Sequence, residues 1–486
     1  MAKHPASFLQ APKQDGFSSQ DRISSQYSPL KTFELPKGEQ KHYTQQFADM
    51  YFLRLAMLKP DIVKIASEAW RDFELAGEKA TQMERVLDVR QGELCWVVGT
   101  IYMEMPLKPN VLDDLAKEHW IAAPPAREKY ISPDGNEEIF MEDESGRLRL
   151  TGDNLRRHLL VTGCIIAALG TENATGDFEV IDIKVADLPN QPSRTQGSGN
   201  SGKIAIVSGL GIAGDGSDPV TLDLLSDFLL GESLPESDSV AQISRLIIAG
   251  NSMAHSSPIP SREEVAARPA ALKRYGHDTS SYNALPSEAL DAFLAQLLPS
   301  IPVTLMPGAT DPASVAIPQQ PLHPALFPHS RAYCNPPTQQ SGPPNWFDSV
   351  TNPWEGDIDG WRFLGNSGQP IDDMYKYLSG TNRLRMMDHL LRWRNNAPTA
   401  PDTLWSYPFQ ESDPFILQQC PHVFFVGNQP HFATSLIEGP AGQQVRLISV
   451  PSFKETGTLV LVDAETLEPE TVTFSTRQPK LATNGV

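Results

Sequence analysis

The fold is decided by the stretch Lys203-Ile-Ala-Ile-Val-Ser-Gly-Leu-Gly-Ile-Ala-Gly214, in which a short apolar run ends in a glycine-rich turn. A helix is predicted to begin near Asp218-Pro219, a favourable N-cap and first-turn pair. Two further apolar runs, at 245–249 and 302–306, flank a second amphipathic helix. Short apolar runs that alternate with amphipathic helices are typical of α/β domains with buried sheets. Residues 203–475 are therefore predicted to form one α/β domain.

The glycines of this stretch, Gly209, Gly211 and Gly214, match the GxGxxG pattern of dinucleotide-binding folds. That pattern works only when a helix N-terminus meets the pyrophosphate directly after the turn. Here the acidic segment Asp215-Gly-Ser-Asp-Pro219 stands between the last glycine and the helix, and an acidic side chain there would repel phosphate. We therefore interpret the motif as a plain glycine-rich turn.

Upstream of the α/β domain, the apolar period changes twice. A helical stripe covers residues 47–58, is interrupted at Lys59-Pro60 and resumes until 69. From about residue 84 the period changes to two, and five short strands between 93 and 185, with turn chemistry between them, predict a small barrel of the OB type. These strands carry few aromatic residues and their loops are acidic, which favours a protein-binding barrel over a nucleic-acid platform.

The remaining segments set the predicted domain boundaries. Residues 1–40 read as a disordered arm, 41–190 as the N-terminal helices with the OB-type domain, 191–202 as a linker, and 476–486 as a tail. The formal net charge of −19 opposes binding to nucleic acid through phosphates. The four cysteines are far apart in sequence and suggest free thiols in a reducing compartment, and neither a signal peptide nor a membrane span is predicted.

The predicted strand ends of the α/β domain resemble the metal-binding loops of calcineurin-like metallophosphoesterases. Those enzymes place the motifs DxH, GD, GNHD, a lone His and GHxH on successive loops, because two divalent metals need carboxylates and imidazoles around them. The corresponding positions here hold Gly209, Gly211, Asn251, Ala309, Thr310, Ser367, Asn428 and Pro430. Neutral side chains cannot supply the charge that such a site requires. We expect no metal, no cofactor and no catalytic residue at these loops.

An OB barrel followed by such a domain resembles the B-subunit family of the eukaryotic replicative DNA polymerases. The delta branch in particular is similar in the ordered stretches Pro-Gly-Ala-Thr-Asp-Pro (307–312), Gln-Gln-Pro-Leu-His-Pro-Ala-Leu-Phe-Pro (319–328), Thr-Asn-Pro (351–353), Gly-Asn-Ser-Gly-Gln-Pro-Ile-Asp-Asp (365–373) and Phe-Val-Gly-Asn-Gln-Pro (425–430). This resemblance covers about residues 40–475. It implies an OB barrel packed on a β-sandwich of the metallophosphoesterase type flanked by helices.

The resemblance also implies a role. It predicts a nuclear, non-catalytic scaffold that docks the cysteine-rich C-terminal domain of the polymerase delta catalytic subunit and a further accessory subunit, with little direct contact to DNA. In some lineages the same subunit also serves the polymerase zeta catalytic subunit. The loops 258–286 and 333–354 are candidate docking surfaces, the second because it concentrates Trp346, Phe347 and Trp354. The alternative is that these aromatic side chains pack within their own domain and anchor the loop there.

Two other functions stay open at this point. A divergent metal-dependent phosphoesterase is the main alternative, and a single-strand-binding OB barrel is the third hypothesis. His323, His329 and Asp311 could be imagined as a different metal set, but histidines without a fixed spacing are more often ordinary hydrogen-bonded residues.

Overall fold

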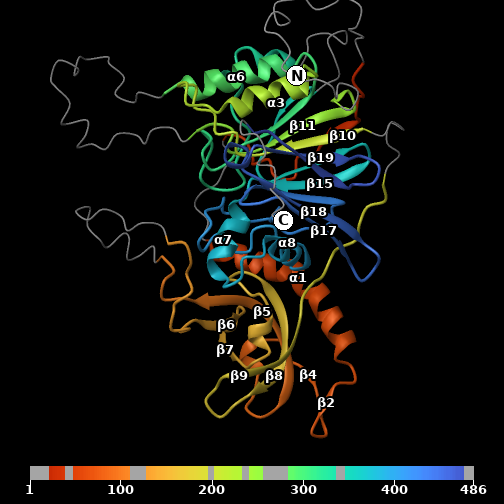
Figure 1. Cartoon of the computed structure of the whole chain (residues 1–486). Coiled ribbons are helices and arrows are strands. Elements are labelled where there is room, and N and C mark those ends of the chain that lie inside the picture. The colour runs from red at the N-terminus through yellow and green to blue at the C-terminus, as the bar shows by residue number, and fades with distance from the viewer. Residues whose placement is uncertain are drawn as a thin grey trace, which may run out of the picture.

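The computed structural model describes residues 21–38, 47–109, 127–194, 202–232, 240–254, 283–334 and 345–475. The described chain forms a barrel and two sheets of six strands each, stacked with helices between and around them (Figure 1). Within these ranges, none of the helices combines the length and the apolar character needed to cross a membrane.

The first sheet has the strand order β13-β12-β11-β10-β19-β20. Its strands are β10 (Lys203–Val207), β11 (Ile243–Ala249), β12 (Val303–Met306), β13 (Phe347–Ser349), β19 (Thr458–Asp463) and β20 (Pro469–Thr473). The four strands from β10 to β13 run parallel, as crossovers through helices require. The apolar runs that predicted β10, β11 and β12 are confirmed, because all three are buried on both faces.

Two helices, α3 (Val220–Leu230) and α6 (Leu285–Leu297), cover the outer face of this sheet (Figure 1). They bury Leu222, Leu225, Phe228, Leu229, Leu290, Phe293, Leu294 and Leu297 in one core with the sheet. The predicted N-cap was wrong, because Pro219 caps α3 and contributes no side-chain bond. Asp218 instead accepts hydrogen bonds from the backbone N–H groups of Ala213 and Gly214, at 2.7 and 2.8 Å. Its carboxylate thus occupies amides that a phosphate would need.

The second sheet has the order β1-β14-β15-β16-β18-β17. Its strands are β1 (Tyr27–Pro29), β14 (Trp354–Ile358), β15 (Trp361–Asn366), β16 (Val423–Gln429), β17 (Ala433–Glu438) and β18 (Gln444–Pro451), followed by the short helix α9 (Phe453–Thr456). Ile206 and Ile247 of the first sheet pack against Phe363, Phe425 and Ile448 of the second in a shared core. The two sheets therefore form a sandwich.

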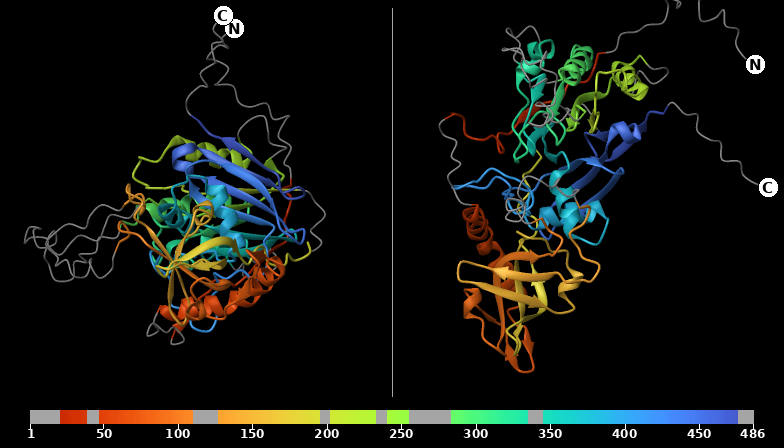
Figure 2. Two further views of the ribbon diagram at one scale, coloured as in Figure 1. Left: turned by 90° about the horizontal axis from the view of Figure 1, so that it is seen from below. Right: turned by 90° about the vertical axis from the view of Figure 1, so that its left-hand side faces the viewer.

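The outer face of the second sheet is covered by α7 (Gln369–Tyr377), by α8 (Arg383–Arg392) and, beyond them, by the barrel (Figures 1 and 2). One hydrophobic core joins barrel residues such as Val97 and Ile166 to Met387 and Leu390 of α8 and Leu447 of β18. Because this core crosses the boundary between barrel and sandwich, the two parts pack as one body.

The barrel closes on itself, in agreement with the predicted OB-type domain. Its strand order is β4-β5-β6-β7-β9-β8, and β5 also pairs with β8. The strands are β4 (Thr81–Gln82), β5 (Leu94–Glu104), β6 (Glu138–Glu142), β7 (Arg147–Thr151), β8 (Ile165–Glu172) and β9 (Phe178–Lys184), and a small hairpin of β2 (Glu74–Leu75) and β3 (Glu78–Lys79) precedes them. The hairpin predicted near residues 137–150 is confirmed as β6 and β7.

The helix α1 (Ala48–Ala69) packs on the barrel and corrects one prediction. It continues through Pro60, where the sequence predicted an interruption. Proline removes one intrahelical hydrogen bond, and that cost is offset here by burial on both sides of it. Leu55 and Leu58 before Pro60, and Ile62 after it, enter one core with the barrel residue Trp96.

The predicted disordered arm is also corrected over residues 21–38, while residues 1–20 lie outside the described chain. In this arm, β1 adds an antiparallel strand to the edge of the second sheet by pairing with β14. The phenol of Tyr27 donates to Asp348 at 2.6 Å, and the Arg245 guanidinium lies 3.7 Å from the centroid of the Tyr27 ring. The arm is thus part of the sandwich.

Neither predicted docking loop is described in full. Most of the loop 258–286 lies outside the described residues, as do residues 335–344 of the second loop. The aromatic residues of the second loop face inward: Phe347 and Trp354 are each 1% exposed, and the Trp346 indole N–H donates to the Leu298 carbonyl. These three aromatics anchor the loop to its own domain, as the alternative interpretation held.

Candidate functional site

The candidate site lies where the parallel strands of both sheets end. In the first sheet, β10, β11 and β12 are aligned in parallel register, so their carboxyl ends lie at one edge. In the second sheet, β15, β16 and β18 are also parallel. Ligand sites of α/β folds form where such strand ends meet, because the loops that follow them converge there.

These loops surround a cavity of about 390 Å³. It is lined by Gly209, Gly211, Asn251, Met253, Ala254, Thr310, Asn428, Gln429, Pro430, Ser452, Lys454 and Glu455. Six of the eight positions singled out in the sequence therefore face one cavity. Of the other two, Ala309 is exposed outside the lining and Ser367 is 3% exposed and packs beneath it.

Neutral side chains cross-link the loops of this cavity. The Asn251 side-chain oxygen accepts from the Thr310 backbone N–H at 3.1 Å. The Asn428 amide donates to the Ser367 carbonyl at 2.8 Å, and the Asn428 backbone N–H donates to the Ser208 hydroxyl at 2.8 Å. Asn251 and Asn428 both adopt left-handed backbone conformations, with φ of 52° and 56°, which asparagine tolerates better than most residues.

Gly250 shows how tightly the loops are packed. Its φ is +81°, and a Cβ there would lie 2.3 Å from the Cβ of Ser367. A side chain at this position would collide across the gap between the two sheets. The glycine therefore allows the loops after β11 and β15 to touch.

Asp311 is the acidic residue buried beneath the cavity. Its carboxylate accepts from the backbone N–H groups of Met253 and Gly308, both at 2.8 Å, and of Ser252 at 3.2 Å. Burial raises the pKa of Asp311 to about 6, although these hydrogen bonds oppose the shift. All three donors belong to neighbouring turns, so the carboxylate ties the loop after β11 to the loop after β12.

The charged groups of the cavity are Lys454 and Glu455. The Lys454 ammonium donates to the Gly211 carbonyl at 2.9 Å. Among the residues that the structure describes, no cluster of three or more His, Cys, Asp or Glu side chains is placed to hold a metal ion. What the cavity offers chemically is a set of amide and hydroxyl groups with one ammonium and one carboxylate.

The imagined metal set of His323, His329 and Asp311 is not supported by the hydrogen bonding. His329 Nδ1 pairs with Asp291 at 2.7 Å, and His323 Nδ1 accepts from the Ala325 backbone N–H at 3.1 Å. Both histidines are thus hydrogen-bonded to neighbouring groups through Nδ1.

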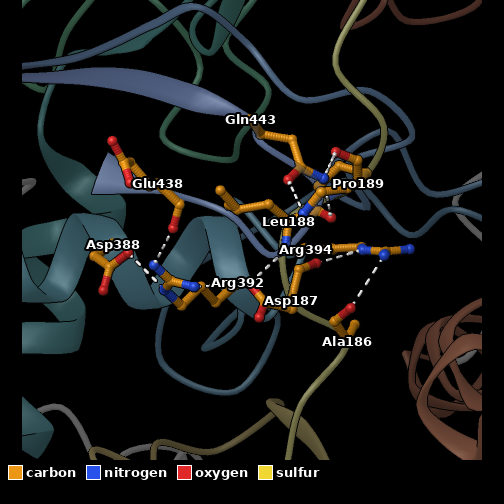
Figure 3. Close-up of polar contacts among 10 residues, drawn as sticks. Ala186, Asp187, Leu188, Pro189, Asp388, Arg392, Arg394, Glu438 and Gln443 are labelled. Atoms are coloured by element: carbon orange, nitrogen blue, oxygen red, sulfur yellow. Dashed lines mark hydrogen bonds and ion pairs between the residues drawn. The ribbon is translucent and has the colours of Figure 1, made fainter. Parts of the chain in front are cut away.

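A second set of polar contacts fixes the barrel to the sandwich, where the chain leaves β9 (Figure 3). Arg394 donates to the Ala186 and Asp187 carbonyls at 3.0 and 2.6 Å, and it pairs with Asp61 of α1 at 2.5 Å. Arg392 of α8 pairs with the Asp187 carboxylate at 2.8 Å. We call Arg392, Arg394 and Asp187 the junction clamp.

The junction clamp continues into the second sheet. The Gln443 amide donates to the Leu188 and Pro189 carbonyls at 3.2 and 3.1 Å, and Arg392 donates to the Glu438 carbonyl at 3.0 Å (Figure 3). The connecting backbone is therefore held from both sides before it reaches residues 195–201, which are outside the described chain.

Comparison with known proteins accounts for both parts of the chain. Residues 46–183 match the family of DNA polymerase delta OB-fold domains, and residues 204–434 match the family of the B subunits of DNA polymerases alpha and epsilon. The DNA polymerase delta small subunit of Arabidopsis thaliana is 37% identical over 460 residues, which cover 94% of this chain and 97% of that protein. The chain belongs to the DNA polymerase delta small-subunit family.

Other members of the delta small-subunit family are similar to this chain over most of their length. The DNA polymerase delta small subunit of Saccharomyces cerevisiae is 35% identical, with 89% of this chain and 90% of that protein covered. DNA polymerase delta subunit 2 of Drosophila melanogaster is 34% identical, with 94% and 99% covered. The family and the OB-type barrel predicted from the sequence are thereby confirmed.

One wall of the strand-end cavity was not predicted from the sequence. It is formed by Ser452, Lys454 and Glu455. These residues follow the end of β18, so the turn after this strand could have been included among the strand-end loops. The Ser208 hydroxyl was also missed as a cross-link, although it donates to the Pro451 carbonyl at 3.0 Å.

Proposed function

We propose that this chain is a non-catalytic scaffold subunit of DNA polymerase delta, acting in the nucleus in DNA replication and repair. The observation that carries the proposal is the end-to-end similarity to proteins named DNA polymerase delta small subunit, over both the barrel and the sandwich. The scaffold docks the cysteine-rich C-terminal domain of the catalytic subunit and a further accessory subunit.

The structure supports the non-catalytic part of this proposal by the character of the cavity. A two-metal phosphoesterase site needs several carboxylates and imidazoles to hold its ions and activate water. The eight positions from Gly209 to Pro430 carry neutral groups. The Asp311 carboxylate accepts hydrogen bonds from three backbone N–H groups. We infer that the sandwich is a calcineurin-like domain whose strand-end loops now serve packing.

The fixed relation between barrel and sandwich supports the scaffold part. A scaffold presents surfaces of two domains to its partners in a constant geometry, which reduces the entropy lost on assembly. The core shared by the barrel, α8 and β18 and the junction clamp provide that constancy here.

The test is co-expression of the full chain with the C-terminal cysteine-rich domains of the alpha, delta, epsilon and zeta catalytic subunits, followed by size-exclusion chromatography. We expect stoichiometric co-elution with the delta domain, alone or together with the zeta domain. Co-elution with the alpha or epsilon domain would contradict the delta assignment, and no co-elution at all would contradict the scaffold role.

Metal analysis of the purified chain tests the main alternative. A divergent phosphoesterase would contain stoichiometric manganese, iron or zinc and would lose phosphodiester hydrolysis on chelation. We expect neither metal nor hydrolysis from the isolated chain.

A further inference from the structure

We propose that a groove between α1 and the barrel, together with the exposed side chains of Phe52 and Trp405, is a docking surface for a basic polypeptide segment of a partner protein. The segment inserts an apolar side chain into the groove and places lysine or arginine side chains on its acidic rim. This inference rests on the proposed scaffold function and assigns it a surface.

The groove is a cavity of about 290 Å³, enough for one or two side chains. It is lined by Ala48, Tyr51, Phe52, Leu55, Thr100, Ile101, Tyr102, Glu142, Asp143 and Asp402. Most of its wall is aromatic or aliphatic, contributed by α1 and by the barrel strand β5. Pockets of this composition accept an apolar anchor, and anchors in such pockets contribute most of the binding free energy at protein interfaces.

Phe52 lines the groove and Trp405 follows three residues after Asp402, which also lines it, and both aromatic side chains are exposed. Phe52 is 49% exposed on α1, and Trp405 is 70% exposed on the loop that carries Asp402. This loop runs along α1, because the Ser406 hydroxyl lies 3.8 Å from the Met50 sulfur and the Ala400 carbonyl accepts from Arg54.

A third exposed apolar residue lies on the segment that is hydrogen-bonded to the Trp405 backbone. Val315 is 80% exposed and lies two residues before Ile317, whose backbone N–H donates to the Trp405 carbonyl at 2.9 Å. Scattered single apolar residues are normal on protein surfaces, but an exposed aromatic side chain in the lining of an apolar groove, with further exposed apolar residues on the adjoining loop, indicates an interaction site.

The charge of the groove identifies the kind of partner. Three carboxylates line it, from Glu142, Asp143 and Asp402, and no residue of its lining is Lys or Arg. Lys108 pairs with Asp402 at 2.8 Å and Arg147 with Glu142 at 2.5 Å, and both cations lie over the Tyr102 ring of the lining, so these two acids are partly neutralised. Among the described residues, the hydrogen-bond donors to Asp143 are neutral and include the backbone N–H groups of Val86 and Ser145.

The remaining negative charge favours a basic segment and disfavours a nucleic-acid strand. A single strand could stack its bases on Phe52 and Trp405, but its phosphates would meet the carboxylates of the groove. A lysine or arginine beside an apolar anchor matches both the wall and the rim. The occupant is therefore a protein segment.

The groove lies where the barrel meets the sandwich part of the chain. One wall belongs to the barrel, whereas Asp402 and Trp405 belong to the sandwich part of the chain. A segment bound there contacts both domains at once. Its affinity then depends on the fixed geometry between them.

The experiment measures the affinity of the full chain for the cysteine-rich C-terminal domain of the delta catalytic subunit and, separately, for the third accessory subunit. The test variants are Phe52→Ser, Trp405→Ser and Glu142→Gln. The matched controls are Val220→Ser on α3 and Leu436→Ser on β17, which are 59% and 46% exposed away from the groove. Circular dichroism and thermal unfolding check that every variant is folded.

We expect Phe52→Ser and Trp405→Ser each to weaken the binding of one of the two subunits at least about tenfold, while both controls bind like the wild type. Glu142→Gln should weaken the same binding a few-fold at low salt and less at high salt, because its charge is then screened.

Three outcomes would overturn the inference. If the wild type binds a subunit and both aromatic variants bind it equally well, the docking surface is wrong and the scaffold function stands. If the wild type binds neither subunit, the scaffold function fails as well. If the aromatic variants instead lose affinity for a single-stranded oligonucleotide that the wild type binds, the occupant is nucleic acid.

Discussion

At the scale of single residues, Asp311 shows how a buried carboxylate beneath the strand-end cavity can serve structure. It is 6% exposed and accepts three backbone hydrogen bonds that join two strand-end loops. A carboxyl group placed for metal binding would present free oxygen atoms to the cavity. Here the oxygen atoms are occupied by the chain itself.

We predict that Asp311→Asn lowers the free energy of unfolding at pH 7 by about 1–3 kcal/mol, because the amide NH₂ group cannot accept from the backbone donors it would face. Urea denaturation measures the change. The exposed carboxyl of Glu411 provides the control, since Glu411→Gln should change stability by less than about 0.5 kcal/mol. Equal effects of the two substitutions would show that Asp311 does not tie the loops.

The raised pKa of Asp311 predicts a dependence on pH with a definite sign. Its pKa is about 6 in the folded chain and 3.8 in the reference state, so the folded chain binds this proton more tightly. The contribution of Asp311 to stability is then fully present below pH 3.8 and is lost as the pH rises through 6. Relative to Asp311→Asn, the wild type should gain about 1.4 kcal/mol between pH 7 and pH 5. Urea denaturation at the two pH values tests this gain, and a constant difference would contradict it.

At the scale of elements, α1 is joined to the sandwich by a buried ion pair. The Arg54 guanidinium lies 2.6 Å from the Asp413 carboxylate, and their side chains are 1% and 0% exposed. Arg54 also donates to the Ala400 carbonyl. Removal of one partner of such a pair leaves a buried charge without compensation.

We predict that Arg54→Met destabilises the chain by about 3–5 kcal/mol, as measured by urea denaturation. The double variant Arg54→Met with Asp413→Leu should recover part of this loss, because it removes the orphaned charge. Arg85 serves as the matched control: it pairs with Asp88 at 3.0 Å on the surface, with side chains 55% and 36% exposed. Arg85→Met should change stability by less than about 1 kcal/mol.

At the scale of the whole molecule, the junction clamp determines how the barrel sits on the sandwich. The single side chain of Arg394 contacts both Asp61 of α1 and the backbone of residues 186 and 187, which are far apart in the chain. The shared hydrophobic core holds the two parts in contact, and hydrogen bonds with fixed geometry select one orientation.

We predict that Arg394→Met broadens the distribution of distances between dyes placed on the barrel and on the sandwich, as measured by single-molecule energy transfer. It should also lower the free energy of unfolding by about 1.5–3 kcal/mol, because three hydrogen bonds to a charged group are lost. Arg149→Met is the control, since Arg149 pairs with Glu138 at 2.7 Å on the barrel surface. An unchanged distance distribution in Arg394→Met would show that the core alone fixes the orientation.

The amino-acid sequence by itself determined which segments form the buried sheets and the barrel. Runs such as Lys203–Val207 and Ile243–Ala249 are mostly apolar. Such a local pattern predicts a strand that is buried on both faces. The sequence also predicted six residues that share the cavity, since carboxyl ends of parallel strands meet at one edge.

Only the tertiary structure decided the conformation and burial of segments whose local sequence patterns are weak or misleading. β1 forms because β14 offers a free edge far along the chain, and α1 runs through Pro60 because the barrel buries both sides of it. Phe347 and Trp354, which were predicted as docking residues, are part of the core, whereas Trp405 is exposed. Edge pairing and burial depend on partners distant in sequence, so neither can be read from a local pattern.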